Sequence, residues 1–236
     1  MSRGAQRTKV LNTPAIELRG LARRFGERTA LSEVSVRVPS GATLAVLGRN
    51  GAGKSTLLRI LATLLRPHAG DVEVLGEPLP RRAFAVRSKI GLLGHEPLLY
   101  RDLTGRENLR YHARLHGLPD EQAERLLGAV GMQRRGDDPV RSLSRGMVQR
   151  LAVCRAVLHD PELLLDEPKA NLDPAASELV EPFIGGGNGR TRVLTSHDPE
   201  AAIEEADLVL GLRDGKPAFL AKPDQLDARQ VKELYA

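Results

Sequence analysis

The chain has 236 residues, a formal net charge of +5, and an ordinary globular balance of 41% hydrophobic and 28% charged residues. Such a length buries a sizeable core and suits one large domain or two interlocked lobes. Cys154 is the only cysteine, which excludes an internal disulfide and favours a reducing compartment. Because only 3% of the residues are aromatic, stacking on bases is not expected, and a nucleotide or a lipid surface is favoured over nucleic acid as an anionic partner.

The N-terminal half begins with a basic, polar stretch, residues 1–13, which we expect to be a flexible tail rather than a secretory signal. Between residues 15 and 47, apolar and polar residues alternate in short pieces separated by Gly and Pro, which predicts strands joined by turns. The longest apolar stretch of the chain follows at residues 57–65. It is interrupted by Arg59 and is too short to span a bilayer.

The middle of the chain has a helical pattern over residues 104–158. Thr104 and Glu107 have the spacing of a capping box, which marks the start of a helix. Strand and helix patterns then alternate over residues 162–221, and this indicates a mainly parallel sheet covered by helices. The sequence therefore predicts an α/β fold with an N-terminal antiparallel β section and a helical subdomain at about 95–150, within a single domain of residues 14–236.

A glycine-rich loop lies between an apolar strand and an amphipathic helix, in the stretch TLAVLGRNGAGKSTLLRILATLL. It fits the phosphate-loop pattern G-x-x-x-x-G-K-[ST], in which the backbone N–H groups point at phosphate oxygens beside a helix N-terminus. The lysine adds a cation for the β- and γ-phosphates, and the serine hydroxyl is placed to ligate Mg²⁺. We expect the nucleotide to be bound by the whole run Gly48, Arg49, Asn50, Gly51, Ala52, Gly53, Lys54, Ser55 and Thr56.

Two adjacent carboxylates, Asp166 and Glu167, follow the apolar run Leu163–Leu165 and precede Pro168. Taken alone, the pair reads equally well as a solvated turn after a strand. Beside a phosphate loop, however, a second strand is needed to deliver an acid to magnesium, and Asp166 ends a strand of that kind. Glu167 is then free to orient or deprotonate the attacking water.

Several further motifs resemble those of the ATP-binding cassette (ABC) ATPases, and the resemblance covers nearly the whole chain. SLSRGMVQRLAVCRA resembles the signature motif, with Ser144 and Gly146 at its characteristic positions, and ANLD (170–173) resembles the D-loop. TSHD places His197 at the switch histidine, and Phe25 stands where the family has an aromatic residue that stacks on adenine. Without the other matches, Phe25 reads as packing, Ser144 as a helix N-cap and His197 as a surface histidine.

The resemblance implies ATP and Mg²⁺ as cofactors and a head-to-tail pair of copies, in which Ser144 and Gly146 contact the ATP of the opposite copy. It also implies multi-span membrane subunits as partners, at the cytoplasmic face of the inner membrane. His95 stands where most members have glutamine, and the resemblance implies that it is a third metal ligand. The implied catalytic residues are Glu167, His197 and Lys54, and the implied metal ligands are Ser55, Asp166 and His95.

The cargo is predicted from a likeness of short stretches. IGLLGHEPLLYRDLTGRENLRYHARLHGL is most similar to the haem-exporter ATPases of cytochrome c maturation, the CcmA type. The resemblance thus favours haem export, with a drug, polysaccharide or other exporter as the alternative. A soluble cassette ATPase acting on ribosomes or DNA is a weaker fit, because only one cassette is present and no long heptad insertion is visible. A kinase or GTPase leaves the LSRGM stretch unexplained.

The strand before Asp166 is one residue shorter than is usual in the family, since Glu162 stands directly before Leu163. A missing residue either withdraws Asp166 by up to about 3.3 Å or is absorbed by a tighter preceding turn. We expect the second, because a metal ligand does not tolerate a displaced oxygen.

Overall fold

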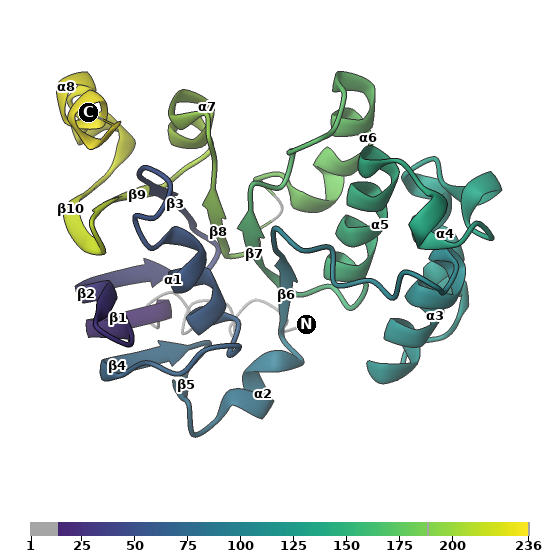
Figure 1. Ribbon diagram of the computed structural model, residues 1–236, viewed down its shortest axis with the longest axis horizontal. Helices are drawn as coiled ribbons and strands as arrows, with labels where there is room; N and C mark the ends of the chain where they lie inside the picture. The colour runs from purple at the N-terminus through teal and green to yellow at the C-terminus, as the bar shows by residue number, and fades with distance from the viewer. Residues whose placement is uncertain (1–13, 188, 236) are drawn as a thin grey trace, which may run out of the picture. The chain divides into compact units, whose positions relative to one another are not determined.

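The computed structural model describes residues 14–187 and 189–235, so the predicted tail 1–13 lies outside the described residues (Figure 1). The chain divides into two compact units, which are described one at a time. Unit 1 contains residues 14–87 and 189–235, and unit 2 contains residues 88–187.

Unit 1 contains an antiparallel sheet of strand order β2-β1-β4-β5. Along β2, the side chains of Val34, Val36 and Val38 are buried while Ser35 and Arg37 are exposed, as expected for a sheet with one face on the core. The strands of this sheet are β1 (Pro14–Phe25), β2 (Arg28–Pro39), β4 (Ala69–Val74) and β5 (Glu77–Leu79).

The other strands of unit 1 are arranged around β3, which lies parallel to both β8 and β9, while β10 pairs antiparallel with β9. Every residue of β3 is buried, which is typical of a central parallel strand covered on both faces. These strands are β3 (Thr43–Leu47), β8 (Arg192–Thr195), β9 (Leu208–Arg213) and β10 (Lys216–Ala221). The helices of unit 1 are α1 (Lys54–Leu61), α2 (Ala83–Arg87), α7 (Pro199–Glu204), the 3-10 turn η3 (Pro223–Gln225) and α8 (Ala228–Tyr235).

Unit 2 combines a parallel pair of strands with a group of helices. The strands are β6 (Ile90–Leu93) and β7 (Glu162–Asp166). Helices α3, α4 and α5 contact one another (Figure 1). The buried residues of α5 lie in its second half, from Leu151 to Val157. The helical elements are α3 (Gly105–Leu115), α4 (Glu121–Ala129), η1 (Gln133–Arg135), η2 (Val140–Ser142), α5 (Arg145–Val157) and α6 (Pro174–Ile184).

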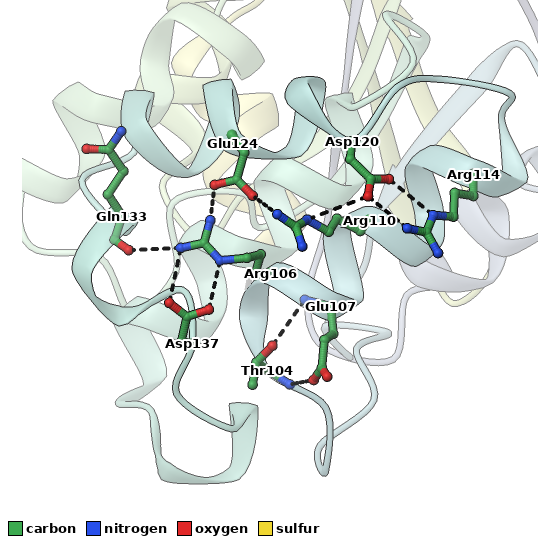
Figure 2. A network of polar contacts seen from close by, with 9 residues as sticks. All are labelled: Thr104, Arg106, Glu107, Arg110, Arg114, Asp120, Glu124, Gln133 and Asp137. Atoms are coloured by element: carbon green, nitrogen blue, oxygen red, sulfur yellow. Dashed lines mark hydrogen bonds and ion pairs between the residues drawn. The ribbon is translucent and has the colours of Figure 1, made fainter.

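The predicted capping box at the start of α3 is present. The Thr104 hydroxyl accepts from the Glu107 N–H at 3.1 Å, and the Glu107 carboxylate accepts from the Thr104 N–H at 2.8 Å (Figure 2). Beside it, a network of ion pairs joins α3 to α4 and to the turn after η1: Arg106 pairs with Glu124 and Asp137, and Arg110 pairs with Glu124 (Figure 2). The helical part of unit 2 is therefore held by polar contacts on its surface as well as by its core.

The predicted fold class is confirmed: an antiparallel N-terminal sheet precedes mainly parallel strands with helices, and a helical section interrupts them. The expected helix ranges are close to those observed, although 3-10 turns separate α4 from α5. Within the described residues, no helix is both long enough and apolar enough to cross a membrane. That residues 14–236 form a single domain stays a prediction.

Candidate functional site

The glycine-rich loop of unit 1 connects β3 to α1 and has a backbone that only glycine tolerates at two positions. Gly48 has φ +146°, and a Cβ atom there would lie 2.3 Å from the carbonyl oxygen of Leu212. Gly53 has φ +104°, and its Cβ would lie 2.5 Å from the carbonyl oxygen of Ala30. The loop is thus fixed by close backbone approach on both sides, which explains the glycines of the motif.

Lys54 is the first residue of α1, and only 7% of its surface is exposed. Its Nζ donates to the carbonyl oxygens of Gly48 at 2.7 Å and of Arg49 at 3.2 Å, so the ammonium is held inside the curve of the loop. No side chain caps the N-terminus of α1, where Gly53 is the N-cap residue. Uncapped N–H groups, a helix N-terminus and a fixed cation together suit an anion with several oxygens, such as a phosphate chain.

A cavity of about 680 Å³ opens beside the loop. Its walls include loop residues Arg49, Asn50 and Gly51, and also Arg28 and Arg213. The lining also contains Asp214 and Glu233, so its three arginines are largely offset and only a small excess of positive charge remains.

Two other predicted residues of unit 1 lie at strand ends. His197 follows the C-terminal end of β8, and because β8 is parallel to β3, it belongs to the same edge of the sheet as Gly48. Its side chain is exposed, in the turn before α7. Phe25 ends β1 with 45% of its surface exposed, and the guanidinium of Arg23 lies 4.7 Å from the ring centroid. The exposure of Phe25 fits a binding surface better than core packing.

In unit 2, the paired acids follow β7. Asp166 is the last strand residue, and Glu167 after it has φ +52°, a left-handed conformation that costs a non-glycine residue about 1–2 kcal/mol. Other described non-glycine residues share this conformation, Asp160 and Asn171 among them, so it does not by itself mark a site. β6 lies parallel to β7 with Leu93 opposite Leu165, so His95, two residues beyond Leu93, belongs to the same sheet edge as the acids.

The short strand before Asp166 is regular. Residues Glu162 to Leu165 pair with β6 in one uninterrupted register, and the turn ahead of them contains Asp160 at φ +55°. The Asp160 N–H donates to the Val157 carbonyl at 3.1 Å, which ends α5 close to the strand. This geometry favours a tightened turn that absorbs the missing residue.

The N-terminus of α5 carries the other predicted motif residues. Ser144 is the N-cap, and its hydroxyl accepts from the Met147 N–H at 3.3 Å. At Gly146, a Cβ would lie 3.1 Å from the carbonyl oxygen of Asn171, so the LSRGM and ANLD stretches lie together in unit 2. The Gln149 amide also donates to the Pro168 carbonyl at 3.0 Å. The residues after Glu167 are thus held against α5.

Comparison with known proteins identifies the family. A family model described as ABC transporter matches residues 31–170. The chain belongs to the ABC transporter family. It is 40% identical over 223 residues to the daunorubicin resistance ATP-binding protein DrrA3 of Streptomyces coeruleorubidus, a match covering 91% of this chain and 70% of that protein. It is 34% identical to the Nod factor export ATP-binding protein I of Ralstonia nicotianae, over 93% of this chain and 71% of that protein.

Solved ABC structures share the fold. The ATP-binding subunit of an ABC transporter has a TM-score of 0.83 and 26% identity, over 93% of this chain and 99% of that chain. A bacterial ABC transporter cassette solved as a dimer has a TM-score of 0.78 and 26% identity, over 88% of this chain and 98% of that chain.

Several residues of this ABC chain that shape the loops are not evident from its motifs. Gln149 is one, and Tyr235 of α8 is another: its hydroxyl accepts from the Gly48 N–H at 3.3 Å. Arg192, 1% exposed in β8, donates to the Thr43 hydroxyl and to the Glu205 carboxylate, each at 3.2 Å. Of these three residues, only Arg192 could have been found from the sequence. An arginine within an apolar strand pattern is buried when the strand is central, and a buried arginine requires a partner.

A magnesium ion was predicted at Ser55, Asp166 and His95. Among the described residues, no group of three or more His, Cys, Asp or Glu side chains forms a metal cage. Mg²⁺ does not need one, since it is bound by one or two protein oxygens together with substrate phosphates and water. The hydroxyl of Ser55 and the carboxylate of Asp166 are donors of that kind, so the residue types fit the ion.

Proposed function

We propose that this chain is the ATP-hydrolysing subunit of an ABC exporter. The observation that carries the proposal is the phosphate loop, whose backbone is locked at Gly48 and Gly53 and whose lysine is buried inside the curve. The identity with DrrA3 and with the Nod factor export protein supports export.

The phosphates of ATP would be held by the N–H groups of residues 48–56 and by Lys54. Ser55 and Asp166 would each supply an oxygen to Mg²⁺, which shields the charge of the phosphates when bound, and His95 would be a further ligand. Glu167 would orient the attacking water, and His197 would contact the γ-phosphate. Phe25 would stack on the adenine ring, for which its exposed position is suited.

A second copy of the chain would complete the site. Ser144 and Gly146 lie at the N-terminus of α5, where a helix favours negative charge, and they would approach the ATP bound by the opposite copy. The solved cassette dimer supports this arrangement. The remaining partner would be a multi-span membrane subunit, which places the chain peripherally at the cytoplasmic face of the inner membrane.

For the cargo, we rely on the named relatives rather than on the short stretches around His95 that resemble haem exporters. The named relatives act in daunorubicin resistance and Nod factor export, and neither name refers to haem or to cytochromes. We therefore favour a drug or polysaccharide exporter over haem export in cytochrome c maturation.

A deletion strain separates these cargoes. We expect it to lose resistance to drugs, or to retain a polysaccharide, while assembling c-type cytochromes normally. Complementation with the chain should restore export. Loss of c-type cytochromes with unchanged export would instead establish the haem function. Co-purification of the tagged chain with a multi-span membrane protein tests the transporter assignment itself.

A further inference from the structure

Arg155 lies near the end of α5 in unit 2, and its side chain is partly buried. Its Nη2 donates to the carbonyl oxygen of Leu92 at 2.5 Å, and its Nε donates to the carbonyl oxygen of Pro97 at 3.1 Å. Within the described part of the chain, no carboxylate pairs with it, and burial lowers its pKa to about 10. The guanidinium thus loses part of its hydration, and two backbone carbonyls compensate for that loss.

The two carbonyls bracket residues 93–96, the segment that contains His95. Its first end is fixed independently, because β6 presses directly on α5: a Cβ at Gly91 would lie 2.1 Å from the Ala156 carbonyl oxygen. The His159 ring nitrogen Nε2 donates to the Ile90 carbonyl at 3.1 Å, one residue earlier in β6. At the far end, the Pro97 carbonyl is bonded by Arg155 and by no other side chain of the described residues, so the guanidinium decides where the segment closes.

The neighbouring imidazoles permit this burial. Burial lowers the pKa of His112 and that of His159 to about 4, and the charge of Arg155 contributes to both. His116, whose pKa burial also lowers, stacks on His159 with ring centroids 3.8 Å apart. The two imidazoles that the Arg155 charge affects are therefore uncharged at neutral pH and do not repel the guanidinium.

We propose that Arg155 is a positioning residue that closes residues 93–96 into a loop of fixed shape and thereby sets where His95 is presented. The part about His95 rests on the proposed function, in which His95 acts at the nucleotide site. The bonds come from two adjacent nitrogens of a planar fork, a geometry that the single ammonium of lysine cannot reproduce. Lysine in its place keeps the charge and loses one of the two carbonyls.

The structural half of the proposal is tested without nucleotide, by hydrogen exchange on Arg155→Lys, Arg155→Met and the control Arg106→Met. Arg106 is a suitable control because its side chain is 19% exposed and bonded to Glu124 and Asp137, away from the loop (Figure 2). Amides of residues 93–100 should exchange at least about tenfold faster in both Arg155 variants and unchanged in the control. Equal exchange in all the proteins, or faster exchange spread over unit 2, would refute the proposal that Arg155 fixes the shape of this loop.

The functional half is tested by a double-mutant cycle between Arg155→Lys and His95→Ala, with kcat and KM for ATP measured in each protein. We expect Arg155→Lys to lower kcat by about tenfold with KM changed less than about threefold, and to cost less than about twofold further once His95 is gone. An equal loss in both backgrounds means that Arg155 serves general stability, which refutes the proposal. Absence of hydrolysis in the wild-type chain would instead refute the proposed function. The hydrogen-exchange result would still show whether Arg155 fixes the shape of the loop.

Discussion

The phosphate loop of unit 1 and the His95 segment of unit 2 are each held by one basic side chain, but in opposite ways. Lys54 bonds to the carbonyls of its own loop, Gly48 and Arg49, six and five residues away. Arg155 bonds to the carbonyls of Leu92 and Pro97, 63 and 58 residues away. The first region is determined by local backbone geometry and has a readable motif, whereas the second depends on tertiary contacts and has none.

The difference extends to the residues around each region. In the phosphate loop, neighbouring backbone atoms occupy the positions where side chains would stand at Gly48 and Gly53. After the His95 segment, the chain is held by the side chain of Asn108, which is fully buried and bonds to Tyr100 and Thr104. A region fixed by backbone resists change as a whole, while one fixed by side chains can be loosened one contact at a time.

The largest effect is expected at Glu167, where the strained backbone of unit 2 presents the proposed water-orienting carboxylate. Glu167→Gln should reduce ATP hydrolysis by about 10²-fold or more, while nucleotide binding stays nearly intact. The trapped ATP should then hold two copies together, which size-exclusion chromatography with ATP would show. Hydrolysis at the wild-type rate would remove Glu167 from the reaction.

One added methyl group should disturb the phosphate loop, because its shape depends on close backbone approach. Gly53→Ala places a Cβ 2.5 Å from the Ala30 carbonyl at φ +104°, so the loop must shift and ATP affinity should fall by about tenfold or more. Gly76→Ala is the matched control, because its φ is +76° and its Cβ would meet nothing within 4 Å. Titration with a fluorescent ATP analogue measures both, and equal affinities in the two variants would contradict a loop locked by close approach.

The chain after the His95 segment depends on the side chain of Asn108. Its amide donates to the carbonyls of Tyr100 at 3.0 Å and Thr104 at 2.9 Å, and its oxygen accepts from the Tyr100 N–H at 2.8 Å. Asn108→Ala removes the partners of the Tyr100 N–H and carbonyl, while the Thr104 carbonyl still accepts from the backbone N–H of residue 108. The free energy of unfolding should fall by about 1–3 kcal/mol in urea titrations. ATP affinity should not change, since the phosphate loop is fixed by its own backbone. A weaker affinity would show that the two regions are not independent.

Acid should affect unit 2 through its histidines. Burial lowers the pKa of His112 and that of His159 from 6.5 to about 4, with Arg155 and His116 adding to the effect and Asp160 opposing it at His159. Between these pH values the unfolded chain binds more protons, so stability is full above about pH 6.5 and falls as the pH approaches 4. His159→Gln should flatten this slope in urea titrations across the range. An unchanged slope in the variant would exclude His159 as a source.

The sequence predicts the parts of this fold that are determined by residues close together in the chain. The capping box at Thr104, the strand at 162–166 and the phosphate loop are each determined by residues a few positions apart. Arg155, Gln149 and Tyr235 were not foreseen, because their partners lie far away in the chain and any polar residue on a helix reads as solvent-exposed. The site roles assigned to His197, Phe25 and His95 stay predictions.

The cargo was the least predictable property. The stretch around His95 resembled haem exporters, whereas the named relatives act in drug resistance and Nod factor export. The residues compared there shape the segment after β6 and the capping of α3. Such contacts maintain the fold of any member of the family, so likeness among them carries little information about what a transporter moves.

We propose that the phosphate loop and the His95 segment serve one magnesium-dependent reaction on ATP. Phosphate release by the purified chain is the measurement that tests this proposal. The wild-type chain should release phosphate from ATP with Mg²⁺ and not with EDTA, and Lys54→Met should abolish both nucleotide binding and release. Phosphate release that persists in Lys54→Met, or a wild-type chain that neither binds nor hydrolyses ATP, would contradict the account.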